Sequence, residues 1–556
     1  MSGKFQFVLC QINSRVGDIN YNKNKIIHAI KEYSDNEIKS VIVFPELALS
    51  GYIPLDQLYY NDLHYKLELA LEEIKSISGP NVVIVGTPRR VIVKDKILLY
   101  NSAFVITNGR VQDIVDKTLL PNYDVFHEKR YFLPSNGPKT ITIENLKIGL
   151  QICEDMWDDR PEHKIKVTQE QINNGADLII NISASPYHWE KPEDRLTVVQ
   201  NHVNQNQNKI PFAYLNLVGS QDEIVFDGRS FIVNSNGELA TCSKSFQEDF
   251  LVFYFEEETK TVQVKSKIKN NYINEWESEI YQAIRINLSD YLEKNHLTNN
   301  VLIALSGGID SALTTALAVD ILGKDNVKTV YLPSKYSSDE STKSARELAN
   351  NLGIELLEIP INEIHDNMIK TIISNTNVKE EFTLADENIQ PRIRSTILMY
   401  LSNKFGGIVI STGNKSEIAC GYTTIYGDSV GGKNLIGDLY KNEVYRLAEY
   451  FNRDQERIPN SIINRPPTAE LRPNQKDNDS LPEYSILDRI LELIIEEELT
   501  IKEIVANGFD VDTVKNVLKL VRRSEFKRSQ ICQTVKLKKR TFGIGRLYPV
   551  TSGFIP

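Results

Sequence analysis

The sequence predicts two α/β domains in one chain. Three observations support this prediction. The chain has 556 residues, and a single hydrophobic core rarely extends past about 250–300 residues. In both halves, β-like runs rich in Val, Ile, Phe and Tyr alternate with amphipathic helical stretches. Between the halves, residues 263–274 turn polar and basic (QVKSKIKNNYIN), which predicts a linker between a domain at 1–262 and a domain at 275–556.

In the first half, several strand candidates are apolar on both faces, as sheets covered by helices require. Helices are expected between them at NYNKNKIIHAIKEY and LHYKLELALEEIKSIS, where apolar residues recur at three-to-four spacing. The expected strands are FQFVLCQI, SVIVFPEL, NVVIVGTP, SAFVITNG, KIGLQIC, ADLIINISAS, PFAYLNLVG and SFIVNSNGE.

The second half opens with a long amphipathic helix, WESEIYQAIRINLSDYLEKN. Strands VLIALS, VKTVYLPS and IELLEIPI then alternate with helices SALTTALAVDILG and STKSARELANNLG. This alternation predicts a doubly wound α/β domain. The segment 465–485 is rich in Pro, Asn and Asp and predicts a long loop, which in a compact domain is usually functional or disordered.

Composition excludes several classes of protein. The net charge of −10 argues against a general nucleic-acid or membrane-surface binder, so neither partner is expected. The five cysteines are scattered without a CxxC pair, which favours a reducing cytoplasm over a disulfide framework or zinc site. The N-terminus lacks the regions of a signal peptide, and no apolar run has the length of a membrane span.

Three polar residues stand at the ends of β-like runs in the first half: Glu46, Lys117 and Cys153. A cysteine thiolate can attack an amide carbonyl, a carboxylate can carry the proton to the leaving amine, and a lysine can stabilise developing negative charge. A lone cysteine is more often a small buried hydrophobe. However, Cys153 is followed by Glu154 and Asp155, an unusual setting for a core residue.

The blocks FPELALSGY, DKTLLPNYDVFHEKRYF and GLQICEDMW resemble the signatures of the nitrilase, or carbon–nitrogen hydrolase, superfamily. The resemblance implies a four-layer αββα sandwich in which Glu46 is the base, Lys117 the electrostatic aid and Cys153 the nucleophile. Glu128 matches a second glutamate that positions substrate.

The segment NISASPYHWEKPEDR is similar to the glutamine pocket of the glutaminase branch of that superfamily. By this resemblance, Tyr123, Ser185 and Lys191 would contact glutamine. For Lys191 a solvated surface position remains an alternative.

The run VLIALSGGIDSALTTAL predicts a strand, a Ser/Gly turn and the start of a helix. Glycines let the backbone approach a ligand, and free N–H groups at the start of a helix favour an anion. SGGIDS resembles the pyrophosphate loop of N-type ATP pyrophosphatases, not the Walker pattern. The resemblance places ATP at Ser306, Gly307, Gly308, Asp310 and Ser311, with Mg²⁺ at Asp310.

Four further stretches resemble the NAD synthetase family: LPSKYSSDEST, ENIQPRIRSTILMYLSN, STGNKSEIACGYTTIYGDSVGG and RPPTAELRPNQKDNDSLPEY. With the nitrilase-like half, nearly the whole chain resembles the glutamine-dependent branch of that family. The resemblance adds Thr412 and Lys441 to the ATP site and Glu417 to the metal site. It assigns deamido-NAD contacts to Asn388, Arg392, Arg394, Glu417, Asp428 and Lys527. A solvated helix face is the alternative for the two arginines.

The resemblance implies ATP-dependent amidation of deamido-NAD through an adenylate, with Mg²⁺ and no redox cofactor. Ammonia would come from glutamine at Cys153 by a water-poor route, and the protein is expected to form a homo-oligomer. Another glutamine-dependent, AMP-forming ligase acting on a different carboxylate is the main alternative. A regulatory protein with decayed sites is a second, and the completeness of both motifs argues against it. A plain amidase would leave the second half unexplained.

Overall fold

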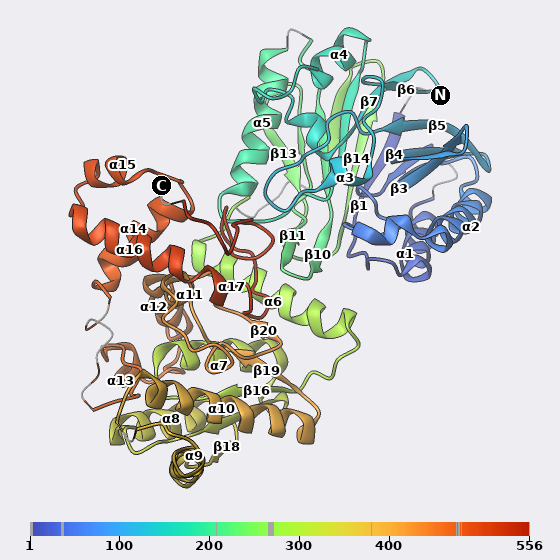
Figure 1. Cartoon of the computed structure of the whole chain (residues 1–556). Helices are drawn as coiled ribbons and strands as arrows, with labels where there is room; N and C mark the ends of the chain where they lie inside the picture. The colour runs from blue at the N-terminus through green and yellow to red at the C-terminus, as the bar shows by residue number, and fades with distance from the viewer. Residues whose placement is uncertain are drawn as a thin grey trace. The chain divides into compact units, whose positions relative to one another are not determined.

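The computed structural model describes residues 4–34, 38–206, 208–264, 272–379, 381–473, 475, 479 and 481–554. The chain divides into two compact units, Met1–Glu275 and Trp276–Pro556 (Figure 1). None of the helices within the described ranges is long and apolar enough to cross a membrane.

Two large sheets form the first unit. The larger sheet has the order β15 (Thr261–Val264), β14 (Asp249–Glu256), β1 (Lys4–Gln11), β2 (Ser40–Val43), β3 (Val82–Val93), β4 (Lys96–Thr107) and β5 (Arg110–Asp116). The second sheet has the order β13 (Leu239–Cys242), β12 (Phe231–Val233), β9 (Phe212–Asn216), β8 (Leu178–Ser183), β7 (Leu146–Ile152) and β6 (Thr140–Ile143). A hairpin, β10 (Val218–Gln221) and β11 (Ile224–Asp227), stands apart from both sheets.

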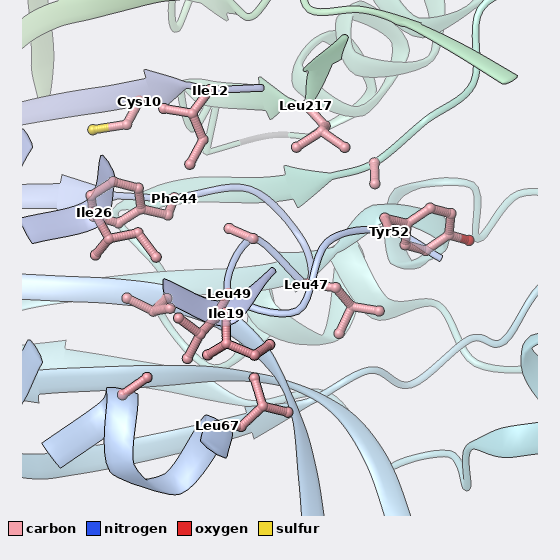
Figure 2. Packing of buried hydrophobic residues seen from close by; sticks show 14 of the residues in the cluster. Cys10, Ile12, Ile19, Ile26, Phe44, Leu47, Leu49, Tyr52, Leu67 and Leu217 are labelled. Carbon is pink, nitrogen blue, oxygen red and sulfur yellow. The ribbon is translucent and has the colours of Figure 1, made fainter. Parts of the chain in front are cut away.

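Three hydrophobic clusters separate the layers of this unit. The middle cluster joins residues of both sheets, including the stacked rings of Phe7 and Phe253. A second cluster packs α1 (Ile19–Tyr33) and α2 (Asn61–Ile77) on the larger sheet; Figure 2 shows Ile19, Ile26 and Leu67 in it. A third packs α4 (Val167–Asn173) and α5 (Lys191–Gln205) on the other sheet. The layers are therefore helix, sheet, sheet and helix, which confirms the predicted sandwich.

The second unit is built on a fully parallel sheet. Its order is β18 (Leu356–Glu358), β17 (Val327–Tyr331), β16 (Val301–Ala304), β19 (Ile408–Ser411) and β20 (Lys433–Asn434). On one face, α10 (Leu384–Phe405) packs against Leu302, Val330 and Val409. The chain leaves β16 first toward β17 and later returns to its other side at β19, so the strand order reverses there. Ligands bind at such switch points in doubly wound folds.

Other helices complete this unit. α7 (Ile309–Leu322) packs against β16 and β17, and α8 (Asp339–Leu352) packs against β17 and α7. A separate apolar cluster joins α11 (Lys415–Cys420), α14 (Tyr484–Ile495), α15 (Ile501–Ala506) and α16 (Val511–Arg523). Among the described residues, the other helices of this unit are α6 (Trp276–Lys294), η3 (Lys324–Asn326), α9 (Asn362–Asn375), α12 (Lys441–Phe451), α13 (Asn460–Ile463) and α17 (Glu525–Arg528). Those of the first unit are η1 (Leu55–Tyr59), α3 (Glu128–Tyr131) and η2 (Cys153–Met156).

The strands depart from the sequence prediction in several places: β5 and β14, for example, were not among the expected strands, and the edges of others moved. The β3–β4 hairpin is longer than expected, since its outer part pairs from Pro88↔Asn101 to Val93↔Lys96. This outer part was not predicted as strand, and its tip is exposed to solvent. Gln263 and Val264, expected in the linker, pair with β14 as the end of β15. The expected linker residues 265–271 lie outside the described residues.

Candidate active sites

The first site lies where three strands of the first unit end. Glu46 follows β2 after Phe44 and Pro45, Lys117 directly follows β5, and Cys153 directly follows β7. Glu46 and Lys117 are fully buried and Cys153 is 3% exposed. Burial of two charged residues requires partners, because an unpaired charge inside a protein is costly.

Lys117 supplies those partners. Its Nζ donates to Glu46 Oε1 at 2.6 Å and to Glu128 Oε1 at 2.8 Å. Asn101 Nδ2 donates to the same Glu46 oxygen at 2.7 Å, and the Ala184 N–H donates to the other at 2.9 Å. Glu128 accepts a further bond from Tyr52 Oη at 2.9 Å. One lysine thus joins two carboxylates in a dry interior.

Electrostatics within this cluster decide the protonation of its members. Burial alone would lower the pKa of Lys117, but Glu128 and Glu46 outweigh burial and raise that pKa well above its ordinary value. Burial raises the pKa of Glu128 to about 7. The pKa of Cys153 is also well raised, by burial and then by Glu46, although Lys117 acts in the opposite direction. The resting thiol is therefore protonated, and a base must remove its proton for attack.

The turn that carries Cys153 is held by its neighbour Asp155. Asp155 accepts backbone N–H bonds from Ile152, Thr118 and Leu119 at 2.8–3.0 Å. It therefore ties the cysteine turn to the residues directly after Lys117. Cys153 itself has a φ of 46°, in the left-handed region. The acidic pair after Cys153 was visible in the sequence, but its role in positioning the turn was not.

A second acidic neighbour, Glu154, gathers side chains at the side of this site. Tyr123 Oη donates to Glu154 Oε2 at 2.7 Å, and Arg160 donates to Oε1 at 3.0 Å. His163 Nε2 lies 2.9 Å from the same Oε1. These bonds fix Tyr123, which the sequence predicts to contact glutamine, next to the turn that carries Cys153.

Ser185 and Lys191 lie at the end of β8 and the start of α5. The Ser185 N–H donates to Asn216, and its Oγ accepts from Arg195, which is buried against Asp227. The Lys191 amino group lies 3.9 Å from the centroid of the Trp157 ring. Burial and then the nearby Arg195 and Arg160 lower the pKa of Lys191 to about 8. Lys191 is thus not the solvated surface lysine of the alternative interpretation.

The second site begins at the turn between β16 and α7. Gly307 has a φ of 84°, and a Cβ there would lie 2.4 Å from the carbonyl oxygen of Ser341. Only glycine fits this position. The Ser311 hydroxyl accepts from the Ser306 N–H at 3.2 Å and lies 3.1 Å from the Ser306 hydroxyl. Hydrogen bonds within the turn therefore fix its shape beside the cavity that it lines.

Lys441 connects the two residues predicted to hold metal. Its Nζ donates to Asp310 Oδ2 at 2.5 Å and to Glu417 Oε1 at 3.1 Å. Burial lowers the pKa of Lys441, but Asp310 and Glu417 outweigh burial and raise it. Asn414 Nδ2 donates to Asp310 Oδ1 at 2.9 Å. Two carboxylates beside an anion-binding turn suit Mg²⁺, which commonly takes one or two carboxylates together with substrate phosphates.

A cavity of about 420 Å³ opens at the carboxyl ends of β16, β17 and β19. Every residue predicted for the nucleotide and acid substrates lines it except Arg392, which is exposed and donates to the Ile425 carbonyl. Those that line it are Ser306, Gly307, Gly308, Asp310, Ser311, Asn388, Arg394, Thr412, Glu417, Asp428, Lys441 and Lys527.

Local contacts hold several of these residues toward the cavity. Arg394 donates to the Leu332 carbonyl, and burial lowers its pKa to about 10. Lys527 donates to the carbonyls of Gly421 and Thr423, both at 2.7 Å. The Thr424 hydroxyl donates to Asn388, and the backbone N–H of Thr424 donates to Asp428. Distant segments of the chain therefore meet at one wall.

Sequence reasoning missed several residues at both sites. Tyr52 and Asn101 bond the carboxylates of the first site, and Arg465 and Glu470 line the cavity of the second. Tyr52 closes the block FPELALSGY, so its position next to the motif was a usable signal. Arg465 and Glu470 belong to the segment 465–485, whose residues 474, 476–478 and 480 lie outside the described residues.

Comparisons with known proteins cover both units. Residues 8–259 match the carbon-nitrogen hydrolase family, and residues 280–531 match the NAD synthase family. A glutamine-dependent NAD(+) synthetase from Aquifex aeolicus is 42% identical over 580 residues, covering 98% of this chain and 99% of that protein. One from Synechocystis is 38% identical, covering 99% of each.

Solved structures agree. A glutamine-dependent NAD+ synthetase from Acinetobacter baumannii, solved with adenosine diphosphate, has a TM-score of 0.77 and is 35% identical, covering 99% of each chain. One from Cytophaga hutchinsonii has a TM-score of 0.80 at 22% identity, covering 100% of this chain and 98% of that one, which supports the fold.

Proposed function

Because the chain belongs to the family of glutamine-dependent NAD(+) synthetases, we propose that it amidates deamido-NAD(+) to NAD(+) with ATP and glutamine. One observation carries the proposal: a buried Glu–Lys–Cys site lies in one unit and a nucleotide-sized cavity with an anion-binding turn lies in the other. An enzyme that only hydrolyses glutamine would not need the nucleotide-sized cavity of the second unit.

Glutamine hydrolysis is assigned to Cys153 and Glu46. Glu46 takes the thiol proton as Sγ bonds to the side-chain amide carbon of glutamine. Glu46 then returns that proton to the leaving nitrogen, the C–N bond breaks, and ammonia and a thioester result. Water, deprotonated by Glu46, cleaves the thioester to glutamate and restores the thiol. The raised pKa of Cys153 makes this base necessary.

Lys117 and Glu128 prepare the reacting groups. The fixed Lys117 ammonium stabilises the negative charge that develops on sulfur and on the carbonyl oxygen. Glu128 holds Lys117 in place, because its Oε1 accepts from the Lys117 ammonium. Tyr52 orients Glu128 by donating to the same oxygen. Tyr123, Ser185 and Lys191 are proposed to contact glutamine, with the Lys191 cation directed at its carboxylate.

Amidation is assigned to the cavity of the second unit. A carboxylate oxygen of deamido-NAD(+) bonds to the α-phosphorus of ATP and pyrophosphate leaves, giving an acyl-adenylate. Ammonia then adds to the acyl carbon, a proton is lost, and AMP leaves with the bonding electrons. Ser306–Ser311 and Lys441 hold the phosphates, and Asp310 and Glu417 would hold Mg²⁺. When bound, Mg²⁺ would offset phosphate charge.

The acid substrate is placed against the remaining wall of the cavity. Asn388, Arg394, Asp428 and Lys527 line it beside Thr412, which we assign to ATP. The 35% identical relative was solved in complex with adenosine diphosphate, which supports an adenine nucleotide as a ligand of this chain. Arg392 lies outside the lining, so its charge would act on the substrate from a distance. We also propose that the protein forms a homo-oligomer. We place it in the cytoplasm, where a reactive thiol stays reduced.

The test is an assay of the pure protein with glutamine, ATP, Mg²⁺ and deamido-NAD(+). We expect NAD(+), AMP, pyrophosphate and glutamate in equal amounts. Parallel assays with other carboxylic acids test the alternative of a ligase with a different acid. AMP formed with another acid and none with deamido-NAD(+) would contradict the proposal.

A further inference from the structure

A second cavity adjoins the nucleotide cavity in the second unit. Its volume is about 460 Å³, and it shares Arg465, Thr468 and the intervening prolines with the first. Arg465 is the shared cation among the described lining residues. Its side chain is 16% exposed, so its charge is largely shielded from solvent. A shielded guanidinium at the border of a phosphate cavity needs an anion.

That anion is a carboxylate of the same segment. Glu470 Oε1 accepts from Arg465 at 2.7 Å and from Ser341 Oγ at 2.9 Å, and its Oε2 accepts from the Ser338 N–H at 3.3 Å. Arg465 also donates to Ser341 Oγ at 2.6 Å and to Ser338 Oγ at 3.2 Å. One carboxylate thus satisfies a guanidinium, a hydroxyl and a backbone N–H that converge on one point.

This point lies directly beside the phosphate turn. The turn and Ser341 are in contact, since a Cβ on Gly307 would lie 2.4 Å from the Ser341 carbonyl oxygen. Donors that hold a carboxylate also hold a phosphate, and Arg binds both through paired N–H bonds. Glu470 has a φ of 48°, in the left-handed region that favours glycine.

We propose that Arg465, Ser338 and Ser341 receive the pyrophosphate end of ATP, and that Glu470 holds their position until nucleotide displaces it. Exchange of one anion for another keeps Arg465 paired throughout, which avoids a bare buried cation. The second cavity then offers pyrophosphate a way out past the same arginine. The inference rests on the proposed function, because it assumes that ATP is the nucleotide cleaved here.

The test measures binding of inorganic pyrophosphate and of AMP to the full-length protein by isothermal titration calorimetry. Arg465→Met should weaken pyrophosphate binding about tenfold or more, because a charge-assisted bidentate contact is lost. Glu470→Gln should tighten it about fivefold, because the competing anion is removed. AMP binding should stay unchanged in both, because AMP lacks the β- and γ-phosphates that leave as pyrophosphate.

Glu340→Gln is the matched control. This substitution removes the same charge from the same border. Glu340 is the weaker partner of Arg465, because it lies 3.7 Å away and is 63% exposed. If Glu470→Gln tightens binding no more than Glu340→Gln, or if Arg465→Met binds pyrophosphate like the wild type, the inference is overturned. Tightening also excludes misfolding as the cause. A wild type that binds pyrophosphate this way but makes no NAD(+) would instead contradict the proposed function.

Discussion

At the scale of residues, the first site places two carboxylates on one ammonium. Glu46 and Glu128 both bond Lys117 in a fully buried cluster, so the cluster holds one negative charge too many when both are ionised. Glu128 responds with a pKa raised to about 7, chiefly because burial disfavours its charged form. Glu46 accepts hydrogen bonds on both carboxylate oxygens, from Lys117, Asn101 and the Ala184 N–H, so its carboxylate is held in one orientation.

This arrangement predicts a pH dependence of stability. The folded pKa of Glu128 is raised, so the folded protein keeps a proton that the unfolded chain loses. Its favourable contribution is complete below the unfolded value of about 4.5 and is lost as the pH rises through about 7. The loss amounts to at most about 1.4 kcal/mol for each pH unit in this window.

Glu128→Gln should therefore reduce the pH dependence of the thermal unfolding midpoint between about pH 4.5 and pH 7. Calorimetry of the variant and the wild type over this range provides the measurement. Glu68→Gln, at an exposed position of α2, is the control and should leave the curve unchanged. Parallel curves for Glu128→Gln and the wild type would show that Glu128 titrates normally.

At the scale of elements, the residues that we propose for the chemistry stand at the ends of strands. Glu46, Lys117 and Cys153 follow β2, β5 and β7, and the phosphate turn follows β16. Strand ends are held by the sheet but leave their next residues free to turn, so they position side chains rigidly. The turn at Gly307 is tightly packed, because a Cβ there would lie 2.4 Å from the carbonyl oxygen of Ser341 in α8.

Gly307→Ala should therefore abolish use of ATP without harming glutamine hydrolysis. The new methyl group would force the turn away from Ser341, and a displacement near 1 Å costs on the order of 100-fold in rate. AMP formation and glutamate formation, measured separately, give the two readings.

Gly323→Ala at the other end of α7 is the matched control. Gly323 has nearly the same φ, 83°, but nothing lies within 4 Å of its added Cβ. It should cost about 1 kcal/mol of stability and keep ATP use. Equal loss of AMP formation in both variants would assign the defect to backbone strain in α7 and not to the phosphate turn.

At the scale of the whole molecule, each unit has its own sheets, its own core and its own site. The two chemistries exchange only a nitrogen species. Free ammonia should therefore replace glutamine as the donor whenever the first site is disabled.

Cys153→Ala should abolish glutamine-supported synthesis of NAD(+) and retain synthesis supported by ammonium salts. In the proposed mechanism, the removed sulfur forms the thioester in the first unit and no bond in the second. Cys242→Ala, a half-buried cysteine of β13, is the control and should support both reactions. Loss of the ammonia-supported reaction in Cys153→Ala would refute the division into two sites.

The sequence by itself determined the elements that bear the chemistry. The strand–turn–helix run around SGGIDS and the strand ends at Glu46, Lys117 and Cys153 depend on local patterns of apolar residues, glycine and charge. Such patterns are readable because backbone preferences act over a few neighbours. The resemblance to known families, and not these local patterns, supplied the thirteen predicted nucleotide and acid-substrate residues, of which twelve line one cavity.

Only the tertiary structure decided which distant residues meet. Lys441 reaches Asp310 across 131 positions, Asn101 reaches Glu46 across 55, and Glu470 reaches Ser341 across 129. Arg392 and Arg394 stand two positions apart on α10, yet only Arg394 lines the cavity, since a helix turns about 200° over two residues. Such contacts follow from how the elements pack, and packing depends on the summed fit of many side chains that no local pattern records.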